Sequence, residues 1–74
     1  MTRAQTIIEG VNSIREELGI SVPSLRDDLT ANYMPKGQAV SVGSVYGWMS
    51  RRRLPSAEGI LALQEWLRKN KGNK

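Results

Sequence analysis

The chain contains neither cysteine nor histidine. Without cysteine it can form no disulfide and no thiolate metal site, and without histidine it lacks the commonest general base and a frequent zinc ligand. We therefore expect no metal, no cofactor and no enzymatic activity. The sequence also lacks an apolar run close to the roughly 18 to 20 residues that cross a bilayer, and a charged start followed by an apolar stretch. This predicts a soluble, cytoplasmic protein with no membrane partner.

The positive charge of the chain is unevenly distributed. With 74 residues the chain has room for one domain, and its net charge is +4. Residues 1–32 hold three basic and five acidic side chains, a net charge of −2, whereas residues 33–74 hold eight basic and two acidic ones, a net charge of +6. A basic cluster is typical of a protein that binds a polyanion such as nucleic acid, although a basic tail is often only a solvated end.

The first part of the chain predicts one long helix over about residues 3–18. Thr2 and Gln5 have the spacing of a capping box at its start, and Gly19 is a suitable C-terminal stop. Apolar residues recur between them at helical spacing and predict a stripe that faces the core: Ile7, Ile8, Val11, Ile14 and Leu18.

A second helix is predicted to begin after Ser21, which can cap it, with Pro23 in the first turn where a missing N–H group costs nothing. Pro35 disfavours helical dihedrals at the residue before it, so this helix should fade near residues 31–34. We therefore expect a loop over residues 32–39, from Asn32 to Ala39.

A third helix is predicted from Ser41 to Ser50. Its inward side would carry Val45, Trp48 and Met49. The opposite side would carry Val42, Gly43, Tyr46, Gly47 and Ser50. Because several of these residues favour strands, a β-hairpin turning at Gly43 and Ser44 stays open at this stage.

The last predicted helix follows Pro55, with Ser56 as a candidate cap. Its apolar side would carry Ile60, Leu61, Leu63, Trp66 and Leu67. The domain would then cover residues 1–68, and residues 69–74 would form a basic, flexible tail. Together these elements predict an all-α fold, a compact bundle of four to five short helices that contains a helix-turn-helix.

The spacing in the second half of the chain resembles that of a known family. Ser41, Val45 and Trp48 are followed by Pro55, seven residues after Trp48, and leucines come eight and twelve residues after that proline. This pattern resembles the lambda-repressor/Cro-like helix-turn-helix family, also called the XRE family. The segment "GISVPSLRDDL" is similar to the start of the first helix of that motif, and the resemblance covers about residues 2–67.

Three features depart from the family pattern. Leu29 and Val40 are separated by ten residues, where the family has a tight turn, so the turn carries an insertion. Arg26 stands where the family prefers a small residue at the crossing of the two helices. Arg51 stands at the place of a common turn glycine. These departures leave the segment from Ser41 to Ser50 intact.

The resemblance implies that residues 42–50 form a recognition helix in the major groove of DNA. The implied base contacts are Val42, Gly43, Ser44, Tyr46, Gly47 and Ser50. The implied phosphate contacts are Ser41, Arg51, Arg52, Arg53 and Lys36. Two glycines bare on the outer face would let the helix backbone approach the DNA. On this hypothesis a bulky side chain at Gly47 leaves the fold intact and abolishes specific binding.

Each of these assignments has a structural alternative. The glycines could serve helix packing, Tyr46 could be a half-buried rim residue, and the three arginines could be a solvated turn. Trp48, Trp66 and Met49 are expected in the core. The insertion is either an inert loop or a segment whose Tyr33 and Lys36 reach the DNA backbone or a second subunit.

The sequence thus predicts sequence-specific binding to double-stranded DNA, in transcriptional regulation of the small repressor or Cro type found in bacteria and phages. The expected form is a homodimer on a two-fold operator, with contacts from the C-terminal helix around Trp66. Two alternatives stay open: an excisionase-like or architectural DNA-binding factor, and a protein-binding helical module such as an antitoxin or anti-repressor. Binding that weakens steeply with salt would separate DNA from protein partners.

Overall fold

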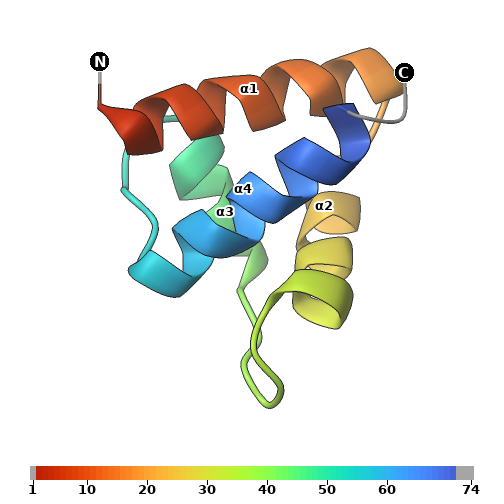
Figure 1. The fold of residues 1–74 in the computed structure, drawn as a ribbon, viewed down its shortest axis with the longest axis vertical. Helices are drawn as coiled ribbons and strands as arrows, with labels where there is room; N and C mark the ends of the chain where they lie inside the picture. Colours follow the sequence, from red (N-terminus) through yellow and green to blue (C-terminus); the bar gives the residue numbers. More distant parts are fainter. Residues whose placement is uncertain (1, 72–74) are drawn as a thin grey trace.

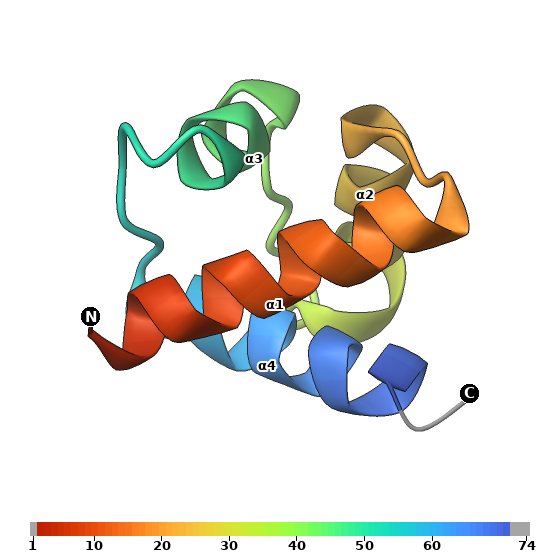
Figure 2. The ribbon, with the colours of Figure 1, turned by 90° about the horizontal axis from the view of Figure 1, so that it is seen from above.

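The computed structural model describes residues 2–71 as an all-α globule of four helices. The elements in chain order are α1 (Arg3–Leu18), α2 (Val22–Asp28), a π-helical turn η1 (Leu29–Tyr33), α3 (Val42–Met49) and α4 (Ala57–Lys71). The part of the chain described has no strand, so the hairpin considered for residues 41–46 is wrong. Helices α1 and α4 pack along each other, with α3 behind them (Figure 1). Viewed from above, α3 lies on one side of the molecule and α4 on the other (Figure 2).

Helix α1 has the boundaries that its capping signals predict. The Gln5 N–H group donates to Thr2 Oγ1 at 3.2 Å, and the Thr2 N–H group donates to Gln5 Oε1 at 2.8 Å, which completes the capping box. At the other end Gly19 is left-handed, with φ 72°, and donates to the carbonyls of the last turn. The apolar stripe is buried up to Ile14, whereas Leu18 is 51% exposed at the helix end and lies outside the core.

Helix α2 begins as predicted, and the helical backbone ends at Tyr33, within residues 31–34 where it is expected to fade. The Ser24 N–H group donates to Ser21 Oγ at 3.2 Å. The chain then stays helical through η1, and the Met34 N–H group donates to the Leu29 carbonyl at 2.8 Å. The expected loop of residues 32–39 is therefore wrong at its start, and the connection runs over residues 34–41. The reason is that Pro35 forces only Met34 into an extended conformation, with ψ 152°.

The core is closed by Trp66 of α4, which is fully buried. Its indole Nε1–H group donates to Asp28 Oδ2 at 2.9 Å, so α4 is joined to the end of α2. The core also contains apolar residues from α1, α2, η1 and α3, among them Val11, Leu25, Leu29, Val45 and Leu63. Because Trp66 is buried, its side chain is not accessible to a second protein molecule, and the expected dimer contact from the C-terminal helix stays a prediction for the other residues of that helix.

Helix α4 differs from its prediction at two places. It extends to Lys71, so residues 69–71 are helical and not part of a flexible tail, while residues 72–74 lie outside the described residues. Basic side chains in the last turn favour this extension through the helix dipole. Leu61, predicted on the apolar side, is 63% exposed. The buried stripe instead follows Gly59, Ala62, Leu63 and Trp66, and Leu61 lies beside it.

The turn between α3 and α4 contains a left-handed residue that is not glycine. Arg51 has φ 64°, in the left-handed region that favours glycine. Its guanidinium forms an ion pair with Glu9 of α1. The left-handed conformation costs a residue with a side chain roughly 1–2 kcal/mol, so the turn is strained although its arginine is held by a partner.

This strain gives a prediction that separates the backbone from the ion pair. Arg51→Ala and Arg51→Gly both remove the pair with Glu9, but only the glycine variant relieves the left-handed conformation. We expect Arg51→Gly to be more stable than Arg51→Ala by about 1 kcal/mol, or about 4–8 °C in thermal melting. Equal melting temperatures would contradict a strained turn.

Candidate nucleic-acid interface

Helix α3 is held in place by its cap and by two buried side chains. The Ser44 N–H group donates to Ser41 Oγ at 3.0 Å, and Ser41 Oγ donates to Ser44 Oγ at 2.9 Å. Val45 and Trp48 are buried in the core. The spacing of three residues between them orients the helix, so that the side opposite Val45 is turned outward.

The exposed side of α3 is narrower than the sequence predicts. Gly43 and Ser50 are exposed, Tyr46 is 53% exposed, and Val42 is half-buried. About half of the Tyr46 surface is thus accessible, which is compatible both with a base contact and with a half-buried rim residue. Gly47 is buried, so its assignment to the bare outer face and to base contacts is wrong. The reason lies outside the helix, because the following turn folds back over this position.

The two glycines of α3 have different surroundings. A Cβ atom built on Gly43 would have only Ser41 Oγ, 4.0 Å away, as a neighbour within contact distance. A Cβ atom built on Gly47 would lie 2.9 Å from Arg53 Cδ. Gly43 thus leaves the backbone of α3 open to a large partner, whereas Gly47 is covered by the arginine side chain. A leucine at Gly47 would displace the Arg53 side chain, and the expectation that it leaves the fold intact stays a prediction.

The hydroxyl groups on α3 are partly occupied by the backbone. Ser50 Oγ donates to the Tyr46 carbonyl at 2.7 Å, so its hydrogen is used at the end of the helix while its lone pairs stay available. Ser41 and Ser44 form the N-terminal cap. Ser41 and Ser50 can therefore accept hydrogen bonds from a partner more readily than they can donate, because their hydroxyl hydrogens are used within the helix, whereas Ser44 Oγ accepts from Ser41.

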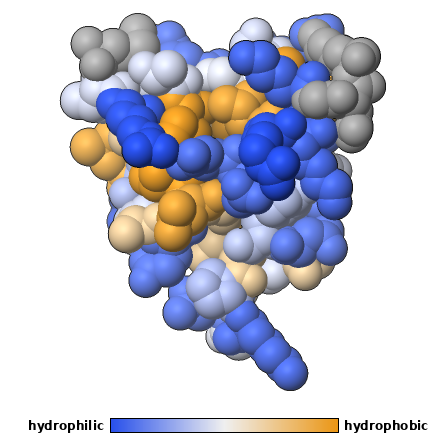
Figure 3. Space-filling view, viewed as in Figure 1, coloured by the Kyte–Doolittle hydropathy of each residue, from blue (hydrophilic) through white to orange (hydrophobic). Residues whose placement is uncertain are grey.

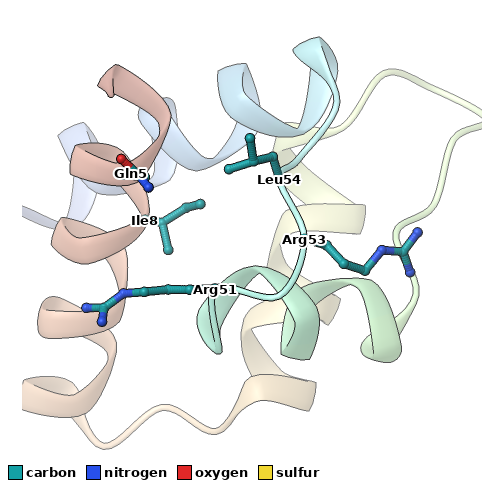
Figure 4. A pocket seen from close by; sticks show the side chains of 5 residues that line it. All are labelled: Gln5, Ile8, Arg51, Arg53 and Leu54. Carbon is teal, nitrogen blue, oxygen red and sulfur yellow. The ribbon is translucent and has the colours of Figure 1, made fainter. Parts of the chain in front are cut away.

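The three arginines of the α3–α4 turn point in different directions. Figure 4 shows Arg51 extending toward α1, where it pairs with Glu9, and Arg53 extending the opposite way above α3. Arg52 is exposed. Within residues 2–71, the guanidinium groups of Arg52 and Arg53 have no hydrogen-bond or ion-pair partner. Two of these three arginines, all predicted to contact phosphates, are thus free, and the third is already paired.

Tyr33 and Lys36, the two residues of the predicted insertion considered for contacts with a partner, have different surroundings. Lys36 is exposed in the loop that protrudes from the body of the molecule (Figure 1). Tyr33 packs against the core, and burial together with the charge of Asp28 raises the pKa of its phenol. Lys36 is therefore accessible to a partner and Tyr33 is a structural residue. The Val40 N–H group donates to Thr30 Oγ1 at 3.3 Å, which ties the end of the loop to η1.

The hollows described on this protein are small or open. One lies between α1 and the α3–α4 turn, has a volume of about 40 Å³ and is lined by Gln5, Ile8, Arg51, Arg53 and Leu54 (Figure 4). That volume holds one or two water molecules. Another, of about 280 Å³, lies between α1 and α4 and has Lys71 as its one ionisable side chain. Small-molecule sites usually start near 300 Å³ and enclose most of their ligand, whereas this hollow is open to solvent.

Further properties of the described residues bear on other classes of function. No group of three or more acidic side chains that could hold a metal ion occurs among residues 2–71. None of the helices described is both long and apolar enough to cross a membrane. Comparisons with protein-family models, with curated proteins and with solved structures find no match for this chain.

Proposed function

We propose that this protein binds double-stranded DNA, with α3 in the major groove. One observation carries the proposal: the exposed side of α3, bare at Gly43, is followed directly by a turn in which Arg52 and Arg53 are exposed and unpaired, and the Arg53 stem lies on Gly47 of the same helix. A helix with its side chains is about 10–12 Å across, and the major groove is about 12 Å wide. Free guanidinium groups beside such a helix are suited to the phosphates that border the groove.

The side chains of α3 suggest a division of roles. Val42 can contact a thymine methyl group, and Tyr46 and Ser44 can form hydrogen bonds with base edges. Ser41, Arg52, Arg53 and the exposed Lys36 are assigned to phosphates, which set the position of the helix and supply most of the affinity. Arg51 is a weaker candidate because Glu9 already neutralises it.

The packing of α2 against α3 supports a helix-turn-helix arrangement with an enlarged connection. The connection of residues 34–41 replaces the tight turn of the lambda-repressor/Cro-like family. Arg26, at the position where that family has a small residue, is half-buried and pairs with Asp27 at 3.2 Å. The proposed biological role is that of a small cytoplasmic transcriptional regulator of the repressor or Cro type. One domain buries a small area on DNA, so two copies on a two-fold operator are proposed.

The proposal is tested by fluorescence anisotropy with random-sequence duplexes at 50 and 200 mM salt, followed by selection and sequencing of bound DNA. A protein that neutralises four phosphates loses about 10²-fold in affinity over this range. We expect such a loss and an enriched, roughly palindromic site. Absence of binding at low salt would refute the proposal. A strongly bent DNA in the complex would assign the protein to the architectural alternative.

A second candidate function, binding to another protein, is favoured by exposed apolar side chains. Leu54 and Leu61 are 66% and 63% exposed. Figure 3 shows a hydrophobic region on the face that carries α1 and α4, surrounded by hydrophilic residues. Large apolar side chains in such a region are common at protein interfaces. A partner whose binding responds weakly to salt would favour this function over DNA binding.

A further inference from the structure

The turn after α3 is folded back onto the helix through one carbonyl group. The Gly47 carbonyl accepts from the Arg52 N–H group at 2.9 Å and from the Arg53 N–H group at 3.2 Å. Ser50 Oγ also approaches it, at 3.4 Å. These bonds set the backbone of the turn relative to the last residues of α3. Arg53 consequently begins directly beside Gly47.

The aliphatic part of the Arg53 side chain then lies on Gly47 itself. A Cβ atom at Gly47 would be 2.9 Å from Arg53 Cδ, 3.2 Å from Cγ and 3.4 Å from Cβ. Carbon atoms in contact are normally about 3.5–4.0 Å apart, so the arginine stem fits here only because residue 47 has no side chain. The glycine is buried by this contact while Arg53 as a whole remains exposed.

We infer that the side chain of Arg53 packs on Gly47, and that Gly47 acts in DNA binding by positioning the Arg53 guanidinium and not by contacting DNA. This inference rests on the proposed function. The stem laid across Gly47 directs the Arg53 side chain above α3, away from Arg51 (Figure 4). An arginine whose stem is already packed loses less conformational freedom when its head group binds a phosphate. Gly47 is thus a positioning residue, whereas Gly43 opens the helix backbone.

The test is a double-mutant cycle of Gly47→Ala and Arg53→Ala, measured with the selected duplex or, if none is enriched, with the random pool. We expect each single variant to weaken binding by about 3–10-fold, consistent with the loss or displacement of one charged contact. The double variant should bind no more weakly than Arg53→Ala alone. The dependence of log K on log salt should flatten by about 0.9 in all three, since one phosphate contact is lost.

Thermal melting of the wild-type protein, the two single variants and the double variant tests the packing of Arg53 on Gly47 without DNA. Alanine is the better helix former, so Gly47→Ala should raise the melting temperature by about 4 °C in the Arg53→Ala background. With Arg53 present the gain should be smaller, because the new methyl group displaces the arginine stem. Gly43→Ala, whose methyl group meets open space, is the matched control for the full gain.

The outcomes separate this inference from the proposed function. Non-additive losses in DNA affinity, together with non-additive changes in melting temperature, support the inference that Gly47 positions Arg53. Additive losses in affinity would overturn it, because Gly47 would then act on DNA by itself. If the wild-type protein binds no DNA, the proposed function fails and the positioning role fails with it. Independent melting temperatures would overturn the packing of Arg53 on Gly47 whatever the DNA result.

Discussion

Replacing Arg52 and Arg53 together by alanine is expected to weaken binding to every DNA sequence by about 10–100-fold at low salt. Each removes one contact to phosphate, and each contact contributes a slope of about 0.9 to the fall of log K with log salt. The slope should therefore flatten by about 1.8. Titration of the double variant with specific and random duplexes at several salt concentrations measures both effects.

A matched control for this double variant is Lys69→Ala with Lys71→Ala. It removes the same charge from α4, on the opposite side of the molecule from α3 (Figure 2). If DNA lies against α3, this control should keep most of the affinity and of the salt dependence. An equal loss in both double variants would mean that binding follows net charge and not the α3 surface. A changed sequence preference at unchanged affinity would contradict the assignment of Arg52 and Arg53 to phosphates.

Replacing Trp66 by alanine is expected to have the largest effect on stability. The side chain is fully buried, and its indole group donates to Asp28 at 2.9 Å. Truncation of a buried tryptophan costs about 3–5 kcal/mol through lost contacts and the cavity left behind. Small domains have total stabilities toward the low end of about 5–15 kcal/mol, so this variant should be largely or wholly unfolded near physiological temperature. Urea unfolding followed by far-ultraviolet circular dichroism measures the change.

Leu61 on the same helix supplies the control for Trp66. It is 63% exposed, so Leu61→Ala should change the free energy of unfolding by no more than about 0.5 kcal/mol. The contrast tests the burial pattern of α4 directly, because the sequence places both residues on one apolar side. A large loss in Leu61→Ala with a small one in Trp66→Ala would mean that α4 is rotated from its position in this structure.

The candidate site was predictable from sequence where it depends on neighbouring residues along the chain. Ser41 and the inward pair Val45 and Trp48 define α3 and the direction of its exposed side. The suggestion that Arg51 occupies a turn-glycine position agrees with its left-handed backbone. No pattern in the sequence predicts the ion pair between Arg51 and Glu9 or the packing of Arg53 on Gly47. No helical or strand periodicity relates Gly47 to Arg53, which belong to different segments.

What the sequence by itself determined is local: the caps at Thr2, Ser21, Ser41 and Ser56, the stop at Gly19, and the all-α class. Each depends on interactions within a few residues, so spacing alone suffices. The tertiary structure decided which side of α4 is buried and that the helical backbone continues from α2 through η1. It also decided which of the two glycines of α3 is exposed. These outcomes depend on contacts between residues far apart in the sequence, which form only when the helices pack together. The burial of Gly47 under the Arg53 stem excludes the exposed position that helical periodicity predicts for this glycine.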